Sequence, residues 1–491
     1  MSDTLVKLTE STLDHLPEVV RRPRYKRSRL TPGIVHIGVG NFHRAHQAWY
    51  THRLMQRDVA MDWGIIGAGV RPYDSAMREK LKAQDWLTTL IELDPKSTAV
   101  EVTGSMIDYI PIEEGNAALI NAMSQASIRI VSMTVTEGGY YLRADGSFDA
   151  DHADMQHDAT HPDRPRSAFG AIIAALQARR ASGYPAFTMM SCDNLQGNGD
   201  ILRQTVLGLA DLSDPDLADW IVRKATFPNS MVDCIVPATG PTEIETVRSA
   251  GIDDAPPVTH EPFRHWVIED KFRSGRPAWE AVGAIMTDDV HDFEVMKLRI
   301  LNGGHQIVAN AGELLGIETI AKASSHPLIA ALFRKVQTDE ILPQVKQVPG
   351  FTPSEYLALI EQRFANPRIV DTTRRVAFDG SSRHPGFILP SIRERLEAGA
   401  PVHGLALVEA LWARMCLGTR EDGSMIEPND PNWDDLVKCA EAAQHDASAW
   451  LGMSSVYDPA IAGNAAFRSA FSTHLERIHS DGVCAVIESY L

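Results

Sequence analysis

Residues 33–43 read GIVHIGVGNFH, a run of apolar, β-branched residues that ends in glycines. The run predicts a buried strand, and residues 41–55 after it have helical character. A strand that enters a helix through glycines is the context of a dinucleotide fingerprint, in which the backbone closely approaches a pyrophosphate. The first two glycines are Gly38 and Gly40, but His43 stands in place of the third. A plain strand-to-helix turn therefore remains an alternative.

The same pattern repeats outward from this turn. Apolar runs followed by polar residues, glycine or asparagine occupy residues 62–70, 128–139 and 185–194, with helical stretches among them. Alternating strands and helices indicate βαβ units and a parallel sheet, in which ligands bind beyond the carboxyl ends of the strands. Three candidate site loops lie at such ends: GVGN (38–41), TEGG (136–139) and SCDN (191–194).

Asp74 is the candidate acid for the cofactor ribose. Fingerprints of this kind place an acidic residue after the second strand, which here ends near Val70. Asp74 could bind the ribose hydroxyls and repel a 2′-phosphate, which favours NAD, whereas Arg71 could attract that phosphate. Asp74 could equally cap the helix that follows it. A second glycine pair, GAG at 67–69, lies on the predicted strand itself and is not assigned to the cofactor.

Helical spacing dominates from about residue 290 onward, where strand signals become few. We therefore predict an α/β protein with an N-terminal dinucleotide-binding domain, residues 1–290, and a mostly α-helical domain, residues 291–491. The chain of 491 residues is long enough to bury more than one core.

Composition narrows the classes of partner. The chain is 44% hydrophobic and 23% charged, as folded globular proteins are, and its formal net charge of −17 argues against nucleic acid and anionic membranes. Five scattered cysteines form neither a disulfide framework nor a zinc motif. Without a signal peptide or a membrane-length apolar run, we expect a cytoplasmic protein. No coiled-coil or repeat pattern indicates assembly, so we expect a monomer. The basic stretch RRPRYKRSR (21–29) is interpreted as a solvated connector.

The stretch KLRILNGGHQ, residues 297–306, carries the candidate chemistry. On one regular α-helix that turns 100° per residue, four polar groups share a side about 140° wide. These groups are Glu294, Lys297, Asn302 and His305. One such polar residue alone would be interpreted as facing solvent, but four complementary groups on an otherwise apolar helix indicate a site.

These groups suit the removal of hydride from a secondary alcohol. Lys297 can act as the base if desolvation lowers its pKa toward neutrality, and the Asn302 amide can donate to the developing oxyanion. His305 can orient a neighbouring hydroxyl. Glu294 would raise the pKa of the lysine, so it is better interpreted as a proton exit than as a permanent partner. No zinc-ligand spacing is present, so the lysine would act without a metal. The glycine pair at 303–304 weakens a helix and is explained if other groups approach its backbone closely.

Together these motifs resemble the polyol-specific long-chain dehydrogenases, the mannitol 2-dehydrogenase family, over essentially the whole chain. Lys-x4-Asn-x2-His matches the catalytic signature of that family. The other matching stretches are GIVHIGVGNFHRAHQA, VSMTVTEGGYY, FTMMSCDNLQGNG, FPNSMVDCIVP, EPFRHWVIEDKF and DGSSRHPGF.

The resemblance implies an expanded Rossmann domain, a largely helical domain with the site between the two, NAD as cofactor and no metal. It implies Lys297 as the general base and Glu294 as a proton gate. Asn194 and Asn302 would hold the reacting oxygen, and His305 would bind an adjacent hydroxyl. The remaining matches are polyol-binding Asp233, Arg375 and Arg383, and cofactor-binding Gly38, Gly40, Asn41, Phe42 and Asp74.

Two positions depart from the family pattern. Cys234 stands where the family usually has arginine, which leaves the placement of the neighbouring Asp233 open. Arg383 stands where lysine is common, and beside Arg375 its planar guanidinium suits an anionic substrate better than a lysine would.

We expect an NAD-dependent dehydrogenase that interconverts D-mannitol and D-fructose, with D-arabinitol and D-sorbitol as further candidate substrates. The stretches IEPNDPNW (426–433) and DTTRRVAFDGSSR (371–383) favour this interpretation. A fructuronate reductase, which forms mannonate, is the main alternative because it shares nearly all of these motifs. A non-catalytic nucleotide-binding relative is a third, against which the intact Lys297, Asn302 and His305 argue.

Overall fold

Pro32–Ile37 form strand β3, the central strand of a five-stranded sheet with the order β7-β4-β3-β8-β9. All neighbouring strands in this sheet pair in parallel. Ile34, Val35 and Ile37 are buried, as expected of a strand that is covered on both faces. The other strands of this sheet are β4 (Gly64–Ala68), β7 (Met106–Tyr109), β8 (Ile130–Met133) and β9 (Thr188–Ser191).

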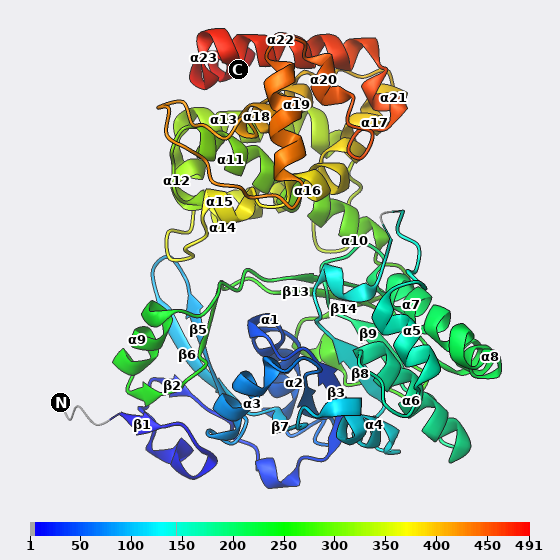
Figure 1. Ribbon diagram of the computed structural model, residues 1–491. Helices are drawn as coiled ribbons and strands as arrows, with labels where there is room; N and C mark the ends of the chain where they lie inside the picture. The colour runs from blue at the N-terminus through cyan, green and yellow to red at the C-terminus, as the bar shows by residue number, and fades with distance from the viewer. Residues whose placement is uncertain (1–4, 144) are drawn as a thin grey trace. The chain divides into compact units, whose positions relative to one another are not determined.

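The parallel sheet lies in the first of two units into which the chain divides. The computed structural model describes residues 5–143 and 145–491. The first unit is Met1–His291 and the second is Asp292–Leu491 (Figure 1).

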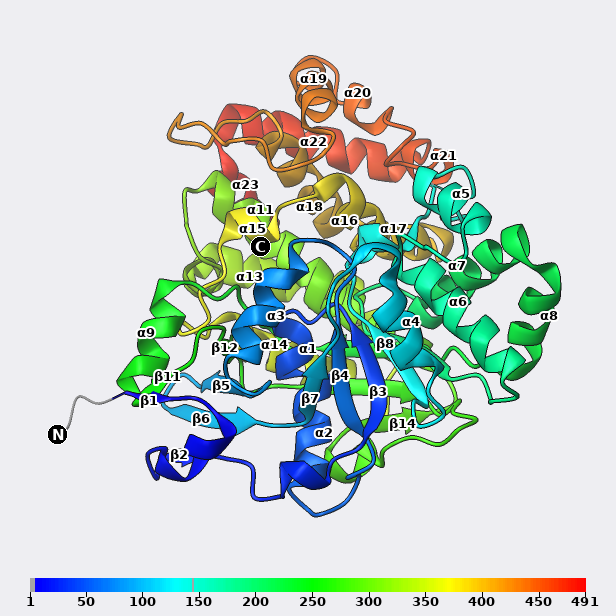
Figure 2. The ribbon, with the colours of Figure 1, turned by 60° about the horizontal axis from the view of Figure 1, so that its bottom comes forward.

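Helices cover both faces of the parallel sheet (Figure 2). Because successive strand residues point to opposite faces, Val35 and Ile37 pack with α4, α6 and α7, whereas Ile34 packs with α2 and α3. This doubly covered parallel sheet confirms the predicted Rossmann-type fold. The helices of the unit are α1 (Asn41–Ala45), α2 (Gln47–Met55), α3 (Asp74–Lys82), α4 (Ala117–Ser124), α5 (Ala153–Thr160), α6 (Ala168–Ala181), α7 (Asn198–Ser213), α8 (Pro215–Lys224) and α9 (Pro241–Ser249).

The order of the strands reverses beside β3. From β3 the chain adds β4 and β7 on one side, then returns to add β8 and β9 on the other. In open parallel sheets, a crevice forms at such a switch point, beyond the carboxyl ends of the strands. The loops GVGN, TEGG and SCDN follow β3, β8 and β9, so all three candidate site loops lie along this edge.

Three smaller sheets in the first unit depart from the predicted βαβ alternation. Their strand orders are β12-β5-β6-β2, β10-β13-β14 and β1-β11. The antiparallel pair β5 and β6 is a hairpin between α3 and β7 that the simple alternation does not contain. The strands are β1 (Val6–Lys7), β2 (Val20–Arg21), β5 (Thr88–Leu93), β6 (Thr98–Thr103), β10 (Ser230–Asp233), β11 (Ile252–Asp253), β12 (Val258–His260), β13 (His265–Glu269) and β14 (Ile285–Thr287).

The second unit is helical, as predicted. Two of its helices, α11 and α18, are buried nearly all round and form its centre. Its α-helices are α10 (His291–Met296, which begins one residue before the unit), α11 (Gly303–Leu314), α12 (Ile320–Ser325), α13 (Pro327–Val336), α14 (Pro353–Phe364), α15 (Thr373–Val376), α16 (Gly380–Phe387), α17 (Leu389–Glu397), α18 (His403–Met415), α19 (Trp433–Ala443), α20 (Ser448–Leu451), α21 (Pro459–Ala462), α22 (Ala465–Asp481) and α23 (Val483–Tyr490).

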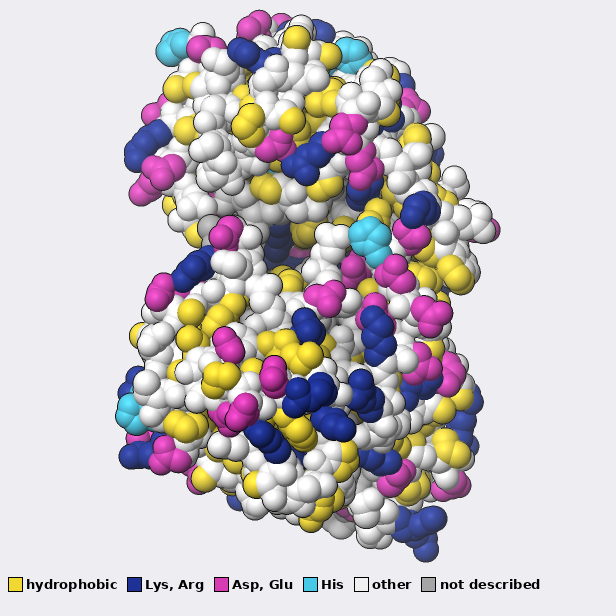
Figure 3. All heavy atoms as spheres, turned by 90° about the vertical axis from the view of Figure 1, so that its right-hand side faces the viewer, with side chains coloured by type: hydrophobic (Ala, Val, Ile, Leu, Met, Phe, Trp, Pro, Cys, Tyr) yellow, Lys and Arg dark blue, Asp and Glu magenta, His cyan; other side chains and the backbone are white. Residues whose placement is uncertain are grey.

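The surface is unevenly charged although the total charge is acidic. On the face drawn in Figure 3, Lys and Arg side chains gather over the first unit, with Asp and Glu scattered around them. Across residues 5–143 and 145–491, no helix has both the length and the hydropathy needed to cross a bilayer.

Candidate active site

The glycine turn after β3 has two different requirements at its two glycines. Gly38 has a φ of 92°, and a Cβ there would lie 2.0 Å from the Thr134 carbonyl oxygen, so only glycine fits. Gly40 precedes α1, and a Cβ there would meet nothing within 4 Å. The protein itself therefore leaves the space beside Gly40 open, which fits a turn that a cofactor approaches.

His43 explains why the third glycine of a fingerprint is absent. Its ring is buried and stacks on His36 with the ring centroids 3.5 Å apart. Burial, with help from the neighbouring histidines and Arg44, holds the pKa of His43 well below its usual value, so the ring is neutral. His36 in turn lies 2.8 Å from the Ser132 hydroxyl on β8. Stacked neutral imidazoles thus fill the space beneath the turn.

Asn41 and Arg44 fasten the same turn to a distant loop. The Asn41 amide donates to the Pro237 carbonyl at 3.1 Å and to the Thr239 hydroxyl at 2.9 Å. Arg44 is buried and donates to the Asn41 side-chain oxygen at 2.6 Å and to the Gly40 carbonyl at 3.3 Å. Arg44 was not among the predicted site residues. It directly follows His43 in the chain, and an arginine on a helix would ordinarily be expected to face solvent.

The two other predicted cofactor residues lie close to the strand ends. Phe42 stacks on His46 with a centroid distance of 4.7 Å. Asp74 is the first residue of α3, and its Oδ2 accepts from the backbone N–H groups of Val70 and Arg71, both at 3.0 Å. The carboxylate therefore closes the turn after β4, and the capping alternative is wrong, because Tyr73 is the N-cap of α3 and no side chain caps that helix.

The loops after β8 and β9 are tied together by Asp193. Its carboxylate accepts from the N–H groups of Val135 and Thr136, both at 3.0 Å, and from the Tyr140 hydroxyl at 2.6 Å. Asn194, the predicted oxygen-binding amide, is the exposed residue that follows. Composition gave no signal for Asp193, but its contacts rigidify the backbone next to Asn194.

Asp233 ends β10 at another place in the first unit. It is buried and pairs with His265 of β13 in the antiparallel register. The neighbouring Ile235 N–H donates to the Glu261 carboxylate at 2.6 Å. Cys234, one of the two positions that we interpreted as departures from the family pattern, is half-buried between them.

In the second unit, the prediction of one regular α-helix over residues 294–305 is wrong in its middle. Lys297–Asn302 form a π-helix, η6, between α10 and α11, and the Gly303 N–H bonds to the Leu298 carbonyl five residues back. A turn closed by i→i+5 bonds is wider than an α-helical turn and brings residue i+5 closer to the side of the helix that carries residue i. Lys297 and Asn302 are therefore closer around the helix axis than in a regular α-helix, where about 140° would separate them.

The glycine pair at 303–304 is explained by close approach. A Cβ on Gly304 would lie 2.6 Å from the Phe333 ring and 3.2 Å from the Gln337 amide nitrogen. A Cβ on Gly303 would lie 3.2 Å from the Phe387 carbonyl oxygen of α16. Neighbouring groups thus pack directly on the backbone where the π-helix ends.

The four predicted groups on this element are mostly withdrawn from solvent. Glu294 and Lys297 are buried at 5% and 7% exposure, and Asn302 and His305 are half-buried. The Asn302 side-chain oxygen is buried and accepts no hydrogen bond within the described residues. An amide oriented in this way is available to a ligand hydroxyl.

His305 is a neutral imidazole. Desolvation lowers its pKa to about 3, and the cations Arg363, Arg375 and Arg383 push it the same way while Asp371 opposes them. The ring stacks on Phe364 with centroids 4.2 Å apart. Neutral His305 can donate or accept a hydrogen bond but cannot supply a proton as an imidazolium.

Arg375 and Arg383 are both engaged inside the protein. Arg375 donates from Nε and Nη2 to the two oxygens of Asp371, at 2.6 and 2.5 Å. Arg383 donates to the Val376 carbonyl at 2.6 Å. The fork of Arg375 that could clamp a substrate carboxylate therefore already holds an internal one.

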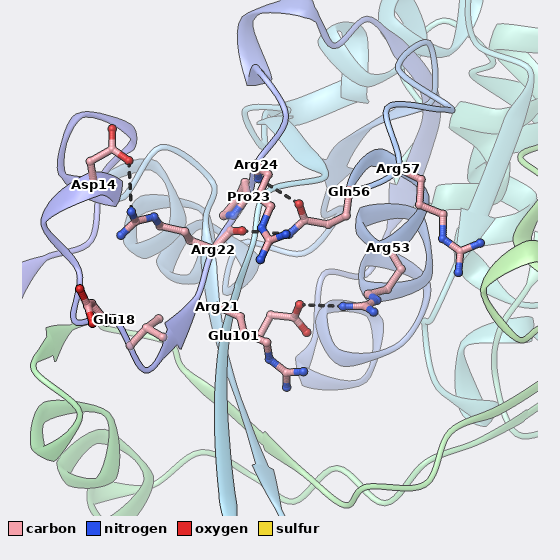
Figure 4. Close-up of a pocket in the computed structure, with 11 residues that line it drawn as sticks. Asp14, Glu18, Arg21, Arg22, Pro23, Arg24, Arg53, Gln56, Arg57 and Glu101 are labelled. Atoms are coloured by element: carbon pink, nitrogen blue, oxygen red, sulfur yellow. Dashed lines mark hydrogen bonds and ion pairs between the residues drawn. The ribbon is translucent and has the colours of Figure 1, made fainter.

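A hollow of about 860 Å³ lies elsewhere, beside the basic connector of the first unit (Figure 4). Its walls include Arg21, Arg22 and Arg24 from the connector and Arg53 from α2. Arg22 lies 3.6 Å from Asp14 and Arg53 lies 3.3 Å from Glu101, so acidic residues offset part of this charge. None of the predicted site residues lines it. Among the described residues, no three His, Cys, Asp or Glu side chains cluster as metal ligands.

Comparison with known proteins identifies the family. The mannitol dehydrogenase Rossmann-domain model matches residues 32–281, and the mannitol dehydrogenase C-terminal-domain model matches residues 289–479. The chain belongs to the mannitol dehydrogenase family. The resemblance seen in the sequence is thereby confirmed.

Several relatives match along nearly the whole chain. Mannitol 2-dehydrogenase of Cereibacter sphaeroides is 53% identical over 472 residues, covering 96% of this chain and 99% of that protein. Mannitol 2-dehydrogenase of Aspergillus terreus is 37% identical over 480 residues, covering 96% of each.

Two solved structures share the fold closely. The ternary complex of Pseudomonas fluorescens mannitol 2-dehydrogenase with NAD and D-mannitol superposes with a TM-score of 0.89 at 39% identity, covering 99% of both chains. A substrate-free D-sorbitol dehydrogenase superposes with a TM-score of 0.90 at 35% identity, covering 98% of this chain and all of the other.

Proposed function

We propose that this chain oxidises D-mannitol at C2 to D-fructose with NAD and catalyses the reverse reduction with NADH. Its family and full-length relatives make it an NAD-dependent oxidoreductase that acts on a CH–OH group. The choice of substrate, the reverse direction and the roles of individual residues are our proposal. The observation that carries it is the π-helix Lys297–Asn302 of the second unit, which begins at the buried lysine and ends at the asparagine.

The turn after β3 would hold the cofactor. Gly38 allows the tight turn, and the open space beside Gly40 would let the pyrophosphate approach the backbone, with Asn41 and Phe42 at the start of α1. Asp74 would meet the adenosine ribose from the start of α3. The nicotinamide of bound NAD accepts the hydride from C2.

Lys297 would remove the proton from the C2 hydroxyl. A buried lysine favours its neutral form, which is the form that accepts a proton. The Asn302 and Asn194 amides would hold the reacting oxygen as its charge develops. Neutral His305 would orient the neighbouring hydroxyl, and Glu294 would pass the proton toward solvent. We propose that no metal takes part, because the lysine supplies the base that a metal-bound hydroxide would otherwise provide.

A polyol is favoured over a hexuronate because Arg375 is already paired with an internal carboxylate. The Asp371 carboxylate already occupies two donors of its guanidinium, and a substrate carboxylate would have to displace it. Arg383, in place of the usual lysine, is the feature that favours the alternative fructuronate reductase. D-Sorbitol and D-arabinitol are further candidate substrates, the former because a D-sorbitol dehydrogenase shares the fold. We also propose a monomer that acts in the cytoplasm.

The deciding experiment compares initial rates of NADH oxidation with D-fructose and with D-fructuronate at equal concentrations. We expect a clear preference for fructose. A preference for fructuronate would overturn the polyol assignment and give Arg375 and Arg383 the role of a carboxylate clamp. NADH binding without turnover of either sugar, or of a wider polyol panel, would instead indicate a non-catalytic relative.

A further inference from the structure

The second unit contains a second π-helix that contacts the first. Gln337–Ile341 form η7, directly after α13, and the Leu342 N–H bonds to the Gln337 carbonyl five residues back. Packing brings η7 against η6. Gln337 is fully buried, although glutamine is among the residues that are mostly exposed in proteins.

The side chain of Gln337 bonds to the backbone of the other π-helix. Its amide nitrogen donates to the Ile300 carbonyl oxygen at 3.1 Å, and Ile300 lies between Lys297 and Asn302. The Gln337 amide passes close to Gly304 to reach this carbonyl: a Cβ on Gly304 would lie 3.2 Å from the Gln337 amide nitrogen. The glycine and the glutamine therefore form one arrangement around the middle of η6.

Simple filling of the core does not explain a glutamine at this place. The Gln337 side-chain oxygen is buried without a hydrogen-bond partner among the described residues. A buried, unsatisfied acceptor is destabilising, and an apolar residue of similar shape would avoid that cost. We therefore explain the glutamine at this position by the hydrogen bond that its amide nitrogen donates to η6.

We propose that Gln337 is a positioning residue that keeps η6 in its π form and so keeps Asn302 on the side of the helix that carries Lys297. π-Helices are rare and appear mostly as single turns within α-helices, so such a turn needs support from its surroundings. A return to regular α-helix would swing Asn302 to about 140° from Lys297 and separate the base from the amide. The inference rests on the proposed roles of Lys297 and Asn302.

The first test replaces the donor and keeps the shape. Gln337→Met should lower kcat for D-mannitol oxidation about tenfold, the size of one lost positioning hydrogen bond, and leave the Kd for NADH unchanged. The kinetic isotope effect with C2-deuterated mannitol should rise, because the chemical step becomes slower relative to product release. Gln344→Met is the matched control: its amide donates at 2.6 Å to the backbone carbonyl of Glu340 in η7 and not to η6, so its kcat and isotope effect should match the wild type.

The second test is a double-mutant cycle with Lys297→Ala. If Gln337 acts by placing Lys297, adding Gln337→Met to Lys297→Ala should change kcat less than twofold. Equal tenfold losses in both backgrounds would overturn the inference and leave the role of Lys297 standing. A Lys297→Ala variant with the kcat of the wild type would instead refute the proposed function itself.

A separate substitution covers the case in which Gln337→Met does not fold. Gly304→Ala places a methyl group against the Phe333 ring and the Gln337 amide while both side chains remain. It should reproduce the lower kcat and the larger isotope effect. A Gly304→Ala enzyme with both values unchanged would contradict the inference.

Discussion

The turn at residues 38–43 and the π-helix at residues 297–302 place functional groups in opposite ways. In the first, the structure leaves space beside Gly40, where we propose that the cofactor approaches the backbone, and the stacked rings of His36 and His43 lie nearby. In the second, side chains would carry the chemistry that we propose, and the backbone departs from regular α-helical geometry. The turn is specified by glycines, which can be recognised from the sequence alone. The second depends on contacts from distant residues, so its sequence signature is weaker.

The largest effect on kcat should come from a substitution in the π-helix at residues 297–302. Lys297→Ala should lower kcat for polyol oxidation about 10²–10⁴-fold, the usual contribution of a general base. The Kd for NADH, measured by fluorescence titration, should stay within twofold because the cofactor turn is in the other unit. Lys322→Ala, which removes an exposed lysine of α12, is the control and should behave as the wild type. A large loss of NADH affinity in Lys297→Ala would contradict the separation of roles.

A smaller effect should distinguish the two glycines of the cofactor turn. Gly38→Ala should lower the melting temperature and weaken NADH binding, because the methyl group meets the Thr134 carbonyl and φ is positive. Gly40→Ala should leave the melting temperature unchanged but raise the Kd for NADH about tenfold, since only a cofactor would meet that methyl group. Unchanged NADH binding in Gly40→Ala would mean that the cofactor does not approach there.

The smallest effect concerns the pH dependence of the free energy of unfolding, because each region contains a histidine that stays neutral in the folded protein. Burial lowers the pKa of His36 and of His305 to about 3, against 6.5 in the unfolded chain. The unfolded state therefore binds more protons between these values, and the free energy of unfolding should fall as pH drops from 6.5 toward 3. Urea denaturation at several pH values measures this slope. His305→Gln should reduce it by about one proton, and an unchanged slope would mean that His305 is already charged when folded.

The sequence predicted four strands of the parallel sheet for a physical reason, but it missed β7. β3, β4, β8 and β9 are buried on both faces, so each is a continuous apolar run that is easy to see. The hairpin of β5 and β6 is different, because threonines and glutamates interrupt its apolar residues without a regular period. Its pairing depends on β12 and β2, which lie far away in the chain.

The candidate site was predictable in its residue types but not in its backbone. Lys297, Asn302 and His305 stand out because polar groups interrupt an apolar helix, and the family resemblance supplied their expected roles. Those roles remain predictions. The π-helix was missed because a periodicity of 3.6 residues continues on both sides of it. Only the glycine pair gave a hint, and its meaning required the positions of Phe333 and Gln337.

The pairing of the first strand has a consequence for how the chain is made on the ribosome. β1 begins at Val6 but pairs with β11 at Ile252, and β13 pairs with β14, which ends at Thr287. The first unit therefore cannot complete its sheets until almost all of its residues have been synthesised. The second unit, Asp292–Leu491, is then still to be translated, which takes roughly 10–40 s at 5–20 residues per second. During that interval the first unit can complete its sheets while most of the helical second unit has not yet been made.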